Sequence, residues 1–205
     1  MHDVHHMWQI SYIGLLLSQN PKMKRKIVIG IGVFLVLVVG TMAYLNNRNR
    51  TLSPPGEASI SNNGFEINVK YSRPSVRERV LFGTEAAGAL QPYGKYWRLG
   101  ANEATEVTFN KDVNVLEESL PAGSYTIYAT PEEEYFEIFF NTDLGNWGAF
   151  PPDHSRDVAS VTVPNEQGEH VEQFTIAFEN QGHLTNMICM FGTTRFAIPF
   201  NPENN

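Results

Sequence analysis

The densest group of chemically capable side chains lies in one short stretch, residues 97–103 (WRLGANE). It contains an indole, a guanidinium, an amide and a carboxylate, from Trp97, Arg98, Asn102 and Glu103. A planar guanidinium beside an amide and a carboxylate can hold a polar ring through several hydrogen bonds, with the indole packed against it. The stretch therefore predicts a site for a small polar ligand such as a sugar or a nucleoside.

The same four residues also fit a purely structural role. In that interpretation Arg98 pairs with Glu103, Asn102 caps backbone groups and Trp97 fills the core. A buried charge is tolerated in a fold when a partner and hydrogen bonds accompany it. The sequence leaves open whether Arg98 and Glu103 face a ligand or each other.

A second group of candidates lies in residues 141–157 (NTDLGNWGAFPPDHSRD), which show no strand pattern. Long irregular segments in compact domains often carry function. Trp147 and His154 are the ligand-binding candidates here. A hydrolase is an alternative, with His154 acting beside Glu103 or Asp153, although the chain has no Gly-x-Ser-x-Gly elbow.

Metal and cofactor chemistry has little support in the sequence. The Asp-His-x-x-Asp spacing of residues 153–157 and the calcium-like start of residues 141–145 are explained better by a solvated acidic loop. The chain has no Walker loop, dinucleotide fingerprint or paired-cysteine motif. We therefore expect no metal, no cofactor and no catalytic role for Cys189, and the balance is against an enzyme.

The elements that must position these residues are β-strands. Apolar and polar residues alternate in short runs with turn-forming residues between them, and one run is apolar on both faces, as in a central strand. These runs are residues 65–71, 106–109, 124–129, 136–140, 159–163, 174–179, 187–191 and 196–200. The predicted fold class is all-β, an antiparallel β-sandwich or jelly-roll-like barrel over residues 64–200 with a tail at 201–205.

An apolar run without charges begins at Ile27 and ends at Leu45, close to the length that spans a bilayer as a helix. Four basic residues precede it and two follow it, which places the N-terminus in the cytoplasm and the β-domain in the periplasm or outside the cell. We expect a single-pass signal anchor at 23–45. The alternative is secretion after cleavage at residues 41–43.

The flanking segments complete the domain organisation. Residues 46–63 are polar and rich in Asn, Ser and Pro, which predicts a flexible tether. Met23 looks like a natural start, so residues 1–22 are expected to be a non-native or disordered extension, and the sequence leaves open whether Met1 or Met23 is the true start.

The charge of the predicted domain excludes one class of binding partner. Residues 51–205 contain nine basic and 21 acidic residues, a net charge of −12. Such a domain repels phosphate backbones, so nucleic acid is an unsuitable partner. With Cys189 as the single cysteine, no intramolecular disulfide can form. The expected partners are the membrane, through the apolar run, and a small polar ligand or an envelope protein.

Five short stretches carry a resemblance to a known family: residues 71–75 (YSRPS), 90–95 (LQPYGK), 97–105 (WRLGANEAT), 120–125 (LPAGSY) and 147–148 (WG). In these stretches the chain resembles domain-of-unknown-function family 2911, which consists of exported bacterial proteins. The resemblance covers roughly residues 58–200 and implies an exported β-rich domain without an assigned activity. It departs from the family at Tyr135-Phe136, where a tryptophan is usual, and at Phe150, where a tyrosine is usual.

Three functions are consistent with these features. The first is a membrane-anchored binding or interaction module whose ligand meets the loops around Arg98, Glu103 and Trp147. The second is the hydrolase described above, which requires His154 and the carboxylates to converge. The third is a structural protein of the cell envelope. Fold-level analogy alone does not separate them.

Overall fold

The computed structural model describes residues 21–203 of the chain. The predicted extension at 1–22 therefore lies almost wholly outside the described residues. The chain divides by its contacts, and the β-rich unit comprises Asn49–Asn205. The predicted all-β class with one preceding apolar helix is confirmed.

The N-terminal helix, α2 (Pro21–Leu52), is long and apolar enough to cross a membrane, and none of its residues is buried. A signal sequence near an N-terminus has the same properties. The helix continues past Leu45 to Leu52, and the first strand begins at Pro55. The stretch predicted as a flexible tether, residues 46–63, is thus helix and then strand.

Twelve strands make up the β-domain, and two sheets contain ten of them. The six-stranded sheet has the order β1-β2-β5-β8-β9-β10 and the four-stranded sheet β11-β12-β6-β7, both antiparallel throughout. The strands are β1 (Pro55–Asn62), β2 (Phe65–Ser72), β3 (Phe82–Gly83), β4 (Gln91–Pro92), β5 (Thr105–Phe109), β6 (Val113–Val115), β7 (Glu118–Leu120), β8 (Gly123–Pro131), β9 (Tyr135–Asn141), β10 (Asp157–Pro164), β11 (Glu166–Gln181) and β12 (Leu184–Pro202). The small remaining sheet pairs β3 with β4 in parallel.

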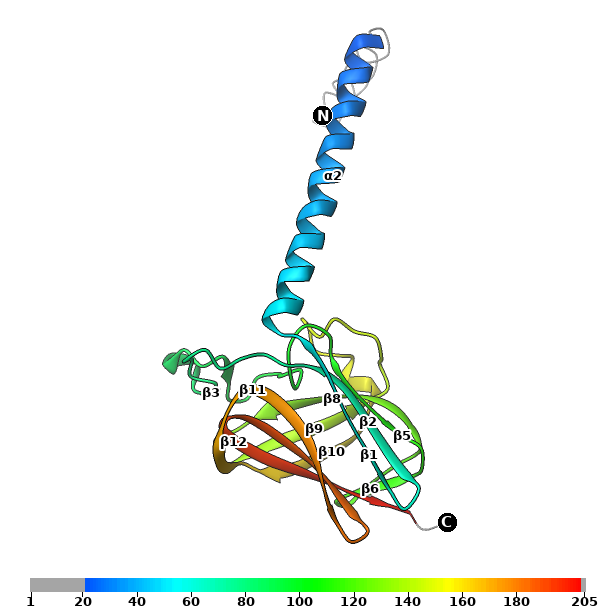
Figure 1. Ribbon diagram of the computed structural model, residues 1–205, viewed down its shortest axis with the longest axis vertical. Coiled ribbons are helices and arrows are strands. Elements are labelled where there is room, and N and C mark those ends of the chain that lie inside the picture. Colours follow the sequence, from blue (N-terminus) through cyan, green and yellow to red (C-terminus); the bar gives the residue numbers. More distant parts are fainter. Residues whose placement is uncertain (1–20, 204–205) are drawn as a thin grey trace, which may run out of the picture. The chain divides into compact units, whose positions relative to one another are not determined.

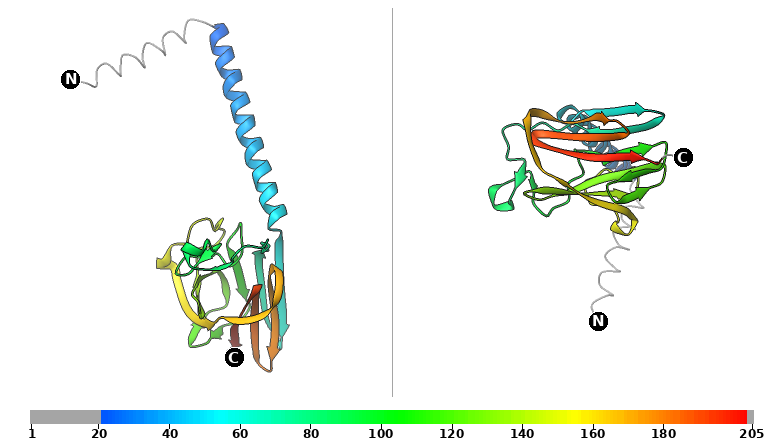
Figure 2. Two further views of the ribbon diagram at one scale, coloured as in Figure 1. Left: turned by 90° about the vertical axis from the view of Figure 1, so that its left-hand side faces the viewer. Right: turned by 90° about the horizontal axis from the view of Figure 1, so that it is seen from below.

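The two large sheets face each other across a common core, as Figures 1 and 2 show. Their edges also meet, because β1 contacts β11 and β10 contacts β7. The alternating side chains that predicted the strands point inward; Phe65, Ile67 and Val69 of β2, for example, are all at most 1% exposed. Burial of such apolar surface is the main stabilisation available to a domain without disulfides.

Local contacts explain two details of the strand pattern. The Tyr125 hydroxyl donates to the carbonyl of Pro121 at 2.8 Å and closes the turn before β8. Residues 187–191 and 196–200, predicted as separate strands, are one strand, β12, because Gly192 takes a φ of 62° and bends the backbone without ending the pairing. Residues 187–191 pair with β11 alone, because β6 pairs only with Asn201 and Pro202 at the far end of β12; the prediction that this run is a central strand therefore holds for its burial on both faces but not for its pairing.

Candidate functional site

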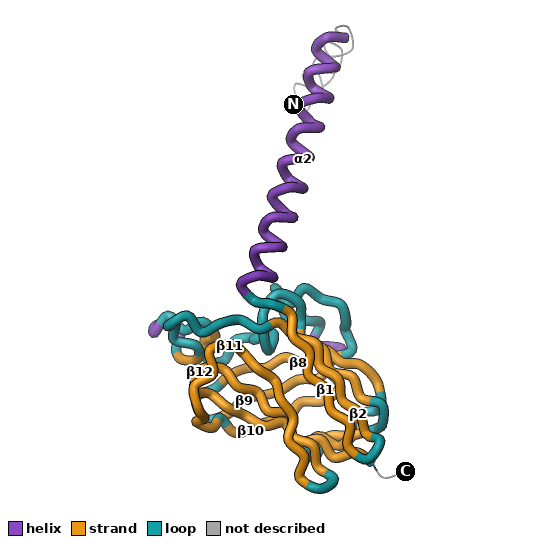
Figure 3. Tube along the Cα trace, viewed as in Figure 1, coloured by secondary structure: helices purple, strands orange, loops and turns teal. Residues whose placement is uncertain are grey.

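The two irregular segments that carry the predicted site residues lie against each other at one end of the β-domain. Residues 141–157 link β9 to β10, and the other segment leads into β5. The backbone N–H of Ala104 donates to the carbonyl of Asn146 at 3.0 Å, and the Tyr96 hydroxyl donates to the carbonyl of Gly148 at 3.5 Å. Figure 3 shows the long loops gathered at the end where β1 begins.

The segment before β5 is held by backbone geometry that few residues allow. Leu99 and Asn102 are left-handed, with φ of 53° and 57°, and Gly100 has a φ of 147°. A Cβ atom on Gly100 would lie 2.8 Å from the carbonyl oxygen of Ser72, so only glycine fits. The Thr105 hydroxyl donates to the Leu99 carbonyl at 2.6 Å and fixes the turn. The turn thereby determines where its flanking side chains point.

A cavity of about 420 Å³ opens beside these loops. Three of the nine basic residues in the stretch 51–205 line it, Arg77, Arg79 and Arg98, whereas none of the 21 acidic residues in this described part of the chain does. Asn102 and Trp147 line the same cavity. In a domain of strong negative charge, such a concentration of guanidinium groups suits an anionic ligand.

Arg98 is the most unusual of the three arginines. Its side chain is half-buried and donates from Nη1 to the carbonyl of Asn102 at 3.0 Å, but it forms no ion pair with any described carboxylate. Burial lowers the pKa of Arg98, and the neighbouring Tyr96 hydroxyl offsets part of that effect. A guanidinium stays protonated in proteins. The domain therefore holds a partly desolvated cation whose charge is unmatched.

Two other predicted residues surround this cation. Trp147 is 43% exposed and leaves indole surface open in the cavity. Asn102 is buried, and its Nδ2 donates to the carbonyls of Ser53 at 3.0 Å and Asn49 at 3.4 Å. Asn102 thus caps backbone groups as its structural interpretation expected, and its own carbonyl orients Arg98.

Trp97 and Glu103 face elsewhere. Trp97 is 1% exposed and packs edge-on against Phe82 and Phe174, so its ring belongs to the core and not to the cavity. Glu103 pairs with Arg50 rather than with Arg98. It lines a neighbouring cavity of about 480 Å³ that contains acidic and basic groups together.

His154 belongs to a separate cluster. Its Nδ1 lies 2.8 Å from the Tyr128 hydroxyl and 3.1 Å from Asp157 Oδ2. Tyr128 donates to the same carboxylate oxygen at 2.7 Å, and Asn141 Nδ2 donates to Asp157 Oδ1 at 2.7 Å. This network ties the two ends of residues 141–157 together beneath the loop that carries Trp147.

The carboxylates of the hydrolase hypothesis have other partners. Glu103 contacts Arg50, and the Asp153 carboxylate accepts the backbone N–H of Ser155 at 3.0 Å as the cap of a short 3₁₀ turn, His154–Arg156. No group of three or more His, Cys, Asp or Glu residues in the described chain is arranged to hold a metal ion. The contacts therefore give His154 one carboxylate partner, Asp157.

The sequence did not single out Arg77 and Arg79. Their segment, residues 73–79 (RPSVRER), contains three of the domain's arginines, and this density is the signal that could have identified it. Arg77 and Glu78 both have positive φ, 52° and 56°, which sequence patterns do not predict. Arg79 Nε donates to the Val76 carbonyl at 3.0 Å and braces the same turn.

Comparison with known proteins assigns the β-domain to a family but gives no activity for it. Residues 53–200 match the family described as "Protein of unknown function (DUF2911)". Neither the curated proteins nor the solved structures provide a match to the chain.

Proposed function

Because the chain belongs to the DUF2911 family, whose function is unassigned, we propose from its geometry that it is a membrane-anchored binding module for a small oxyanion-bearing ligand. The ligand's phosphate or carboxylate group would occupy the cavity lined by Arg77, Arg79 and Arg98. The supporting observation is Arg98, a half-buried guanidinium without a carboxylate partner in the described chain.

The energetics favour an external anion as the missing partner. Desolvating a charge without pairing it costs free energy, so a domain keeps such an arrangement where a ligand repays that cost. Guanidinium groups bind carboxylate and phosphate in a bidentate manner. The open face of Trp147 adds an apolar wall against which a ring could pack.

The anchor belongs to the same proposal. The apolar part of α2 would be retained in the membrane, with the basic N-terminal side in the cytoplasm and the β-domain in the periplasm or outside the cell. Intact mass measurement of the chain purified from membranes tests this directly. A mature chain that begins near residue 44 in the soluble fraction would contradict it.

Anion binding is tested by thermal unfolding of the full chain in detergent, with phosphate or sulfate replacing chloride at constant ionic strength. A ligand at 100 times its Kd stabilises a protein by about 2.7 kcal/mol. For a domain of this size that corresponds to a rise of roughly 5–10 °C in Tm. The rise should disappear in Arg98→Gln, whose own Tm should stay close to wild type because no ion pair is lost.

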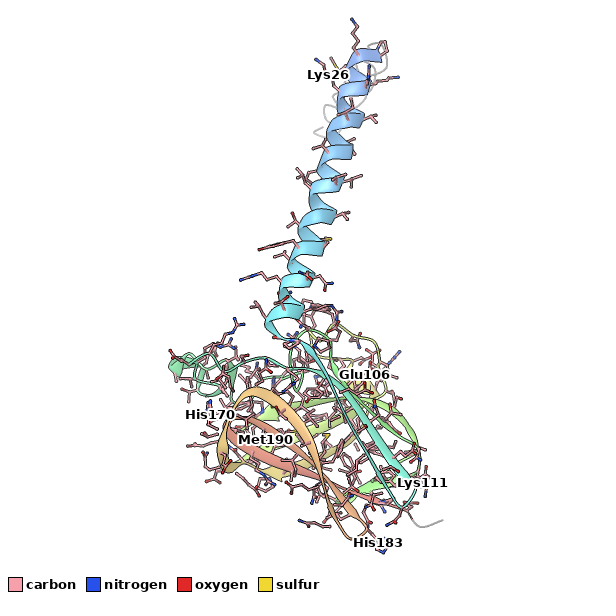
Figure 4. All side chains as sticks on the ribbon, in the orientation of Figure 1. Lys26, Glu106, Lys111, His170, His183 and Met190 are labelled. Carbon is pink, nitrogen blue, oxygen red and sulfur yellow. The ribbon has the colours of Figure 1, made fainter. Side chains whose placement is uncertain are left out.

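The charge-matched control is Lys111→Gln. Figure 4 shows Lys111 with His183 at the opposite end of the β-domain, and both line a different cavity. This variant should keep the full response to phosphate. Equal responses in Arg98→Gln and wild type, or no response in either, would eliminate the arginine-lined cavity as an anion site.

A further inference from the structure

The loop that carries Trp147 exposes three large apolar side chains at intervals of three residues. Leu144 is 44% exposed, Trp147 43% and Phe150 83%. Single exposed apolar residues are normal on a protein surface, but several on one loop mark a contact surface. Tryptophan and phenylalanine in particular are suited to the interfacial layer of a membrane.

The arginine-lined cavity lies at the same end of the domain. Trp147 and the partly exposed Leu90 line it together with Arg77, Arg79 and Arg98. Apolar tips combined with basic side chains are the arrangement that binds membrane surfaces, because lipid headgroups present phosphates above an apolar layer. The domain as a whole has a net charge of −12, so a cavity lined by three arginines and no acidic residue of the described chain is a local positive site on it.

Chain connectivity places this end within reach of lipid. Asn102 Nδ2 donates to the carbonyl of Ser53, so the loop end of the domain contacts the residue that directly follows α2. The apolar run ends at Leu45, and the helical residues from there to Leu52 rise about 10 Å. The headgroup layer on each side of a bilayer is itself about 5–8 Å thick.

We infer that the loop end of the β-domain rests on the outer membrane surface, with Leu144, Trp147 and Phe150 in the headgroup layer and the cavity arginines on lipid phosphates. This inference rests on the retained anchor and the anion cavity of the proposed function, and it names the anionic headgroup of a phospholipid as the source of the oxyanion. In this inference the opposite end of the domain, where Figure 3 shows short turns between the strands, is the end away from lipid.

The experiment uses the full chain reconstituted into phosphatidylcholine–phosphatidylglycerol vesicles that contain lipids brominated close to the headgroup. Emission of wild type minus that of Trp147→Phe isolates Trp147 from the other two tryptophans. The brominated lipid should quench Trp147 severalfold more than it quenches the emission remaining in Trp147→Phe. Acrylamide in the water phase should quench Trp147 less in vesicles than in detergent.

A Leu144→Ser/Phe150→Ser variant separates the two proposals, because both side chains are exposed and their loss spares the core. It should lose the lipid quenching but keep the rise in Tm caused by inorganic phosphate. The matched control is Tyr135→Ser, 43% exposed at the start of β9, a strand length from the loop, which should keep both responses.

Two results would overturn the inference. One is Trp147 emission that resists brominated lipid and stays open to acrylamide in vesicles. The other is quenching that survives in Leu144→Ser/Phe150→Ser. In either case an intact response to inorganic phosphate keeps the anion cavity, now for a soluble ligand, whereas loss of both responses in wild type rejects both proposals.

Discussion

Among single residues, Tyr128 has the most constrained environment. Its ring stacks on Phe139 with centroids 4.8 Å apart, and its hydroxyl contacts Asp157 and His154. Burial raises the pKa of Tyr128 well above its ordinary value, and the Asp157 carboxylate adds to that effect. Burial also raises the pKa of Tyr96 and of Tyr125.

These shifts predict loss of stability at alkaline pH. A tyrosine with a raised pKa keeps its proton in the folded state above pH 10, where the unfolded chain has lost it, so the stabilisation is complete below about pH 10 and falls as pH rises further. For each such tyrosine the slope is at most about 1.4 kcal/mol per pH unit, and it applies between the pKa in the unfolded chain and the raised pKa in the folded state. In Tyr128→Phe the free energy of unfolding, measured by urea titration from pH 9 to 12, should fall less steeply than in wild type. Identical slopes would contradict the buried position of the hydroxyl.

At the scale of elements, the loop of residues 141–157 approaches Arg98 closely at Gly148, one of two loop glycines in left-handed conformations. Gly148 has a φ of 68° and Gly145 a φ of 77°. A Cβ atom on Gly148 would lie 3.0 Å from the backbone nitrogen of Ala104 and 3.2 Å from Arg98 Cδ, whereas one on Gly145 would meet nothing within 4 Å. A side chain at either position would therefore be strained by the positive φ, but only a side chain at position 148 would also collide with neighbouring atoms.

This pair gives a matched test of the loop's position. Each Gly→Ala change costs about 1 kcal/mol from its positive φ. Gly148→Ala should also lift the loop from Arg98 and weaken phosphate binding severalfold, measured as the phosphate concentration at half-maximal rise in Tm. Gly145→Ala should bind phosphate as wild type does. Equal binding in all three proteins would show that contact of the loop with Arg98 is irrelevant to the anion.

The elements that could be predicted from sequence are those whose pattern is local. The alternation in residues 65–71 and 136–140 identifies β2 and β9, because one face of each strand is buried. Strand β1 (PGEASISN) has no strongly apolar face, since it lies at the sheet edge with only Ala58 and Ile60 packed on the core, so composition alone predicted a tether.

The candidate site divides in the same way. Arg98, Asn102 and Trp147 were predicted from residue type, and the fold brings them to one cavity. The ion-pair partner of each charged side chain was not predictable, because it depends on segments that are distant in sequence. Glu103, for example, pairs with Arg50, 53 residues earlier. Residue type shows which side chains can do chemistry, whereas tertiary packing decides which of them meet.

At the scale of the β-domain, the core and the cavity share a residue, Phe191. The buried apolar cluster draws residues from both large sheets, including Phe136 of β9 and Phe196 of β12, whose rings stack with centroids 4.3 Å apart. Phe191 follows Cys189 closely in β12 and also lines the arginine-lined cavity. Binding in the cavity should therefore stabilise β12 and the core together.

Cys189, the single cysteine, reports on that coupling. It is 0% exposed, and burial raises the pKa of its thiol, so a thiol reagent at pH 8 should reach it only when the sandwich opens. Its labelling rate should rise with urea in step with the loss of circular dichroism. When opening and closing are fast relative to labelling, a ligand that binds the folded state lowers the rate by the factor 1 + [L]/Kd.

Phosphate should therefore slow the labelling of Cys189 in wild type and leave it unchanged in Arg98→Gln, although the thiol itself touches no ligand. An Asn63→Cys substitution in the exposed β1–β2 turn provides a control thiol that should react at once, with or without phosphate. If Cys189 were labelled as fast as that control, the Cys189 thiol would not be buried in the folded domain. If phosphate still slowed labelling in Arg98→Gln, the anion would stabilise the domain from another site. The expected slowing depends only on phosphate binding to the folded state in the arginine-lined cavity.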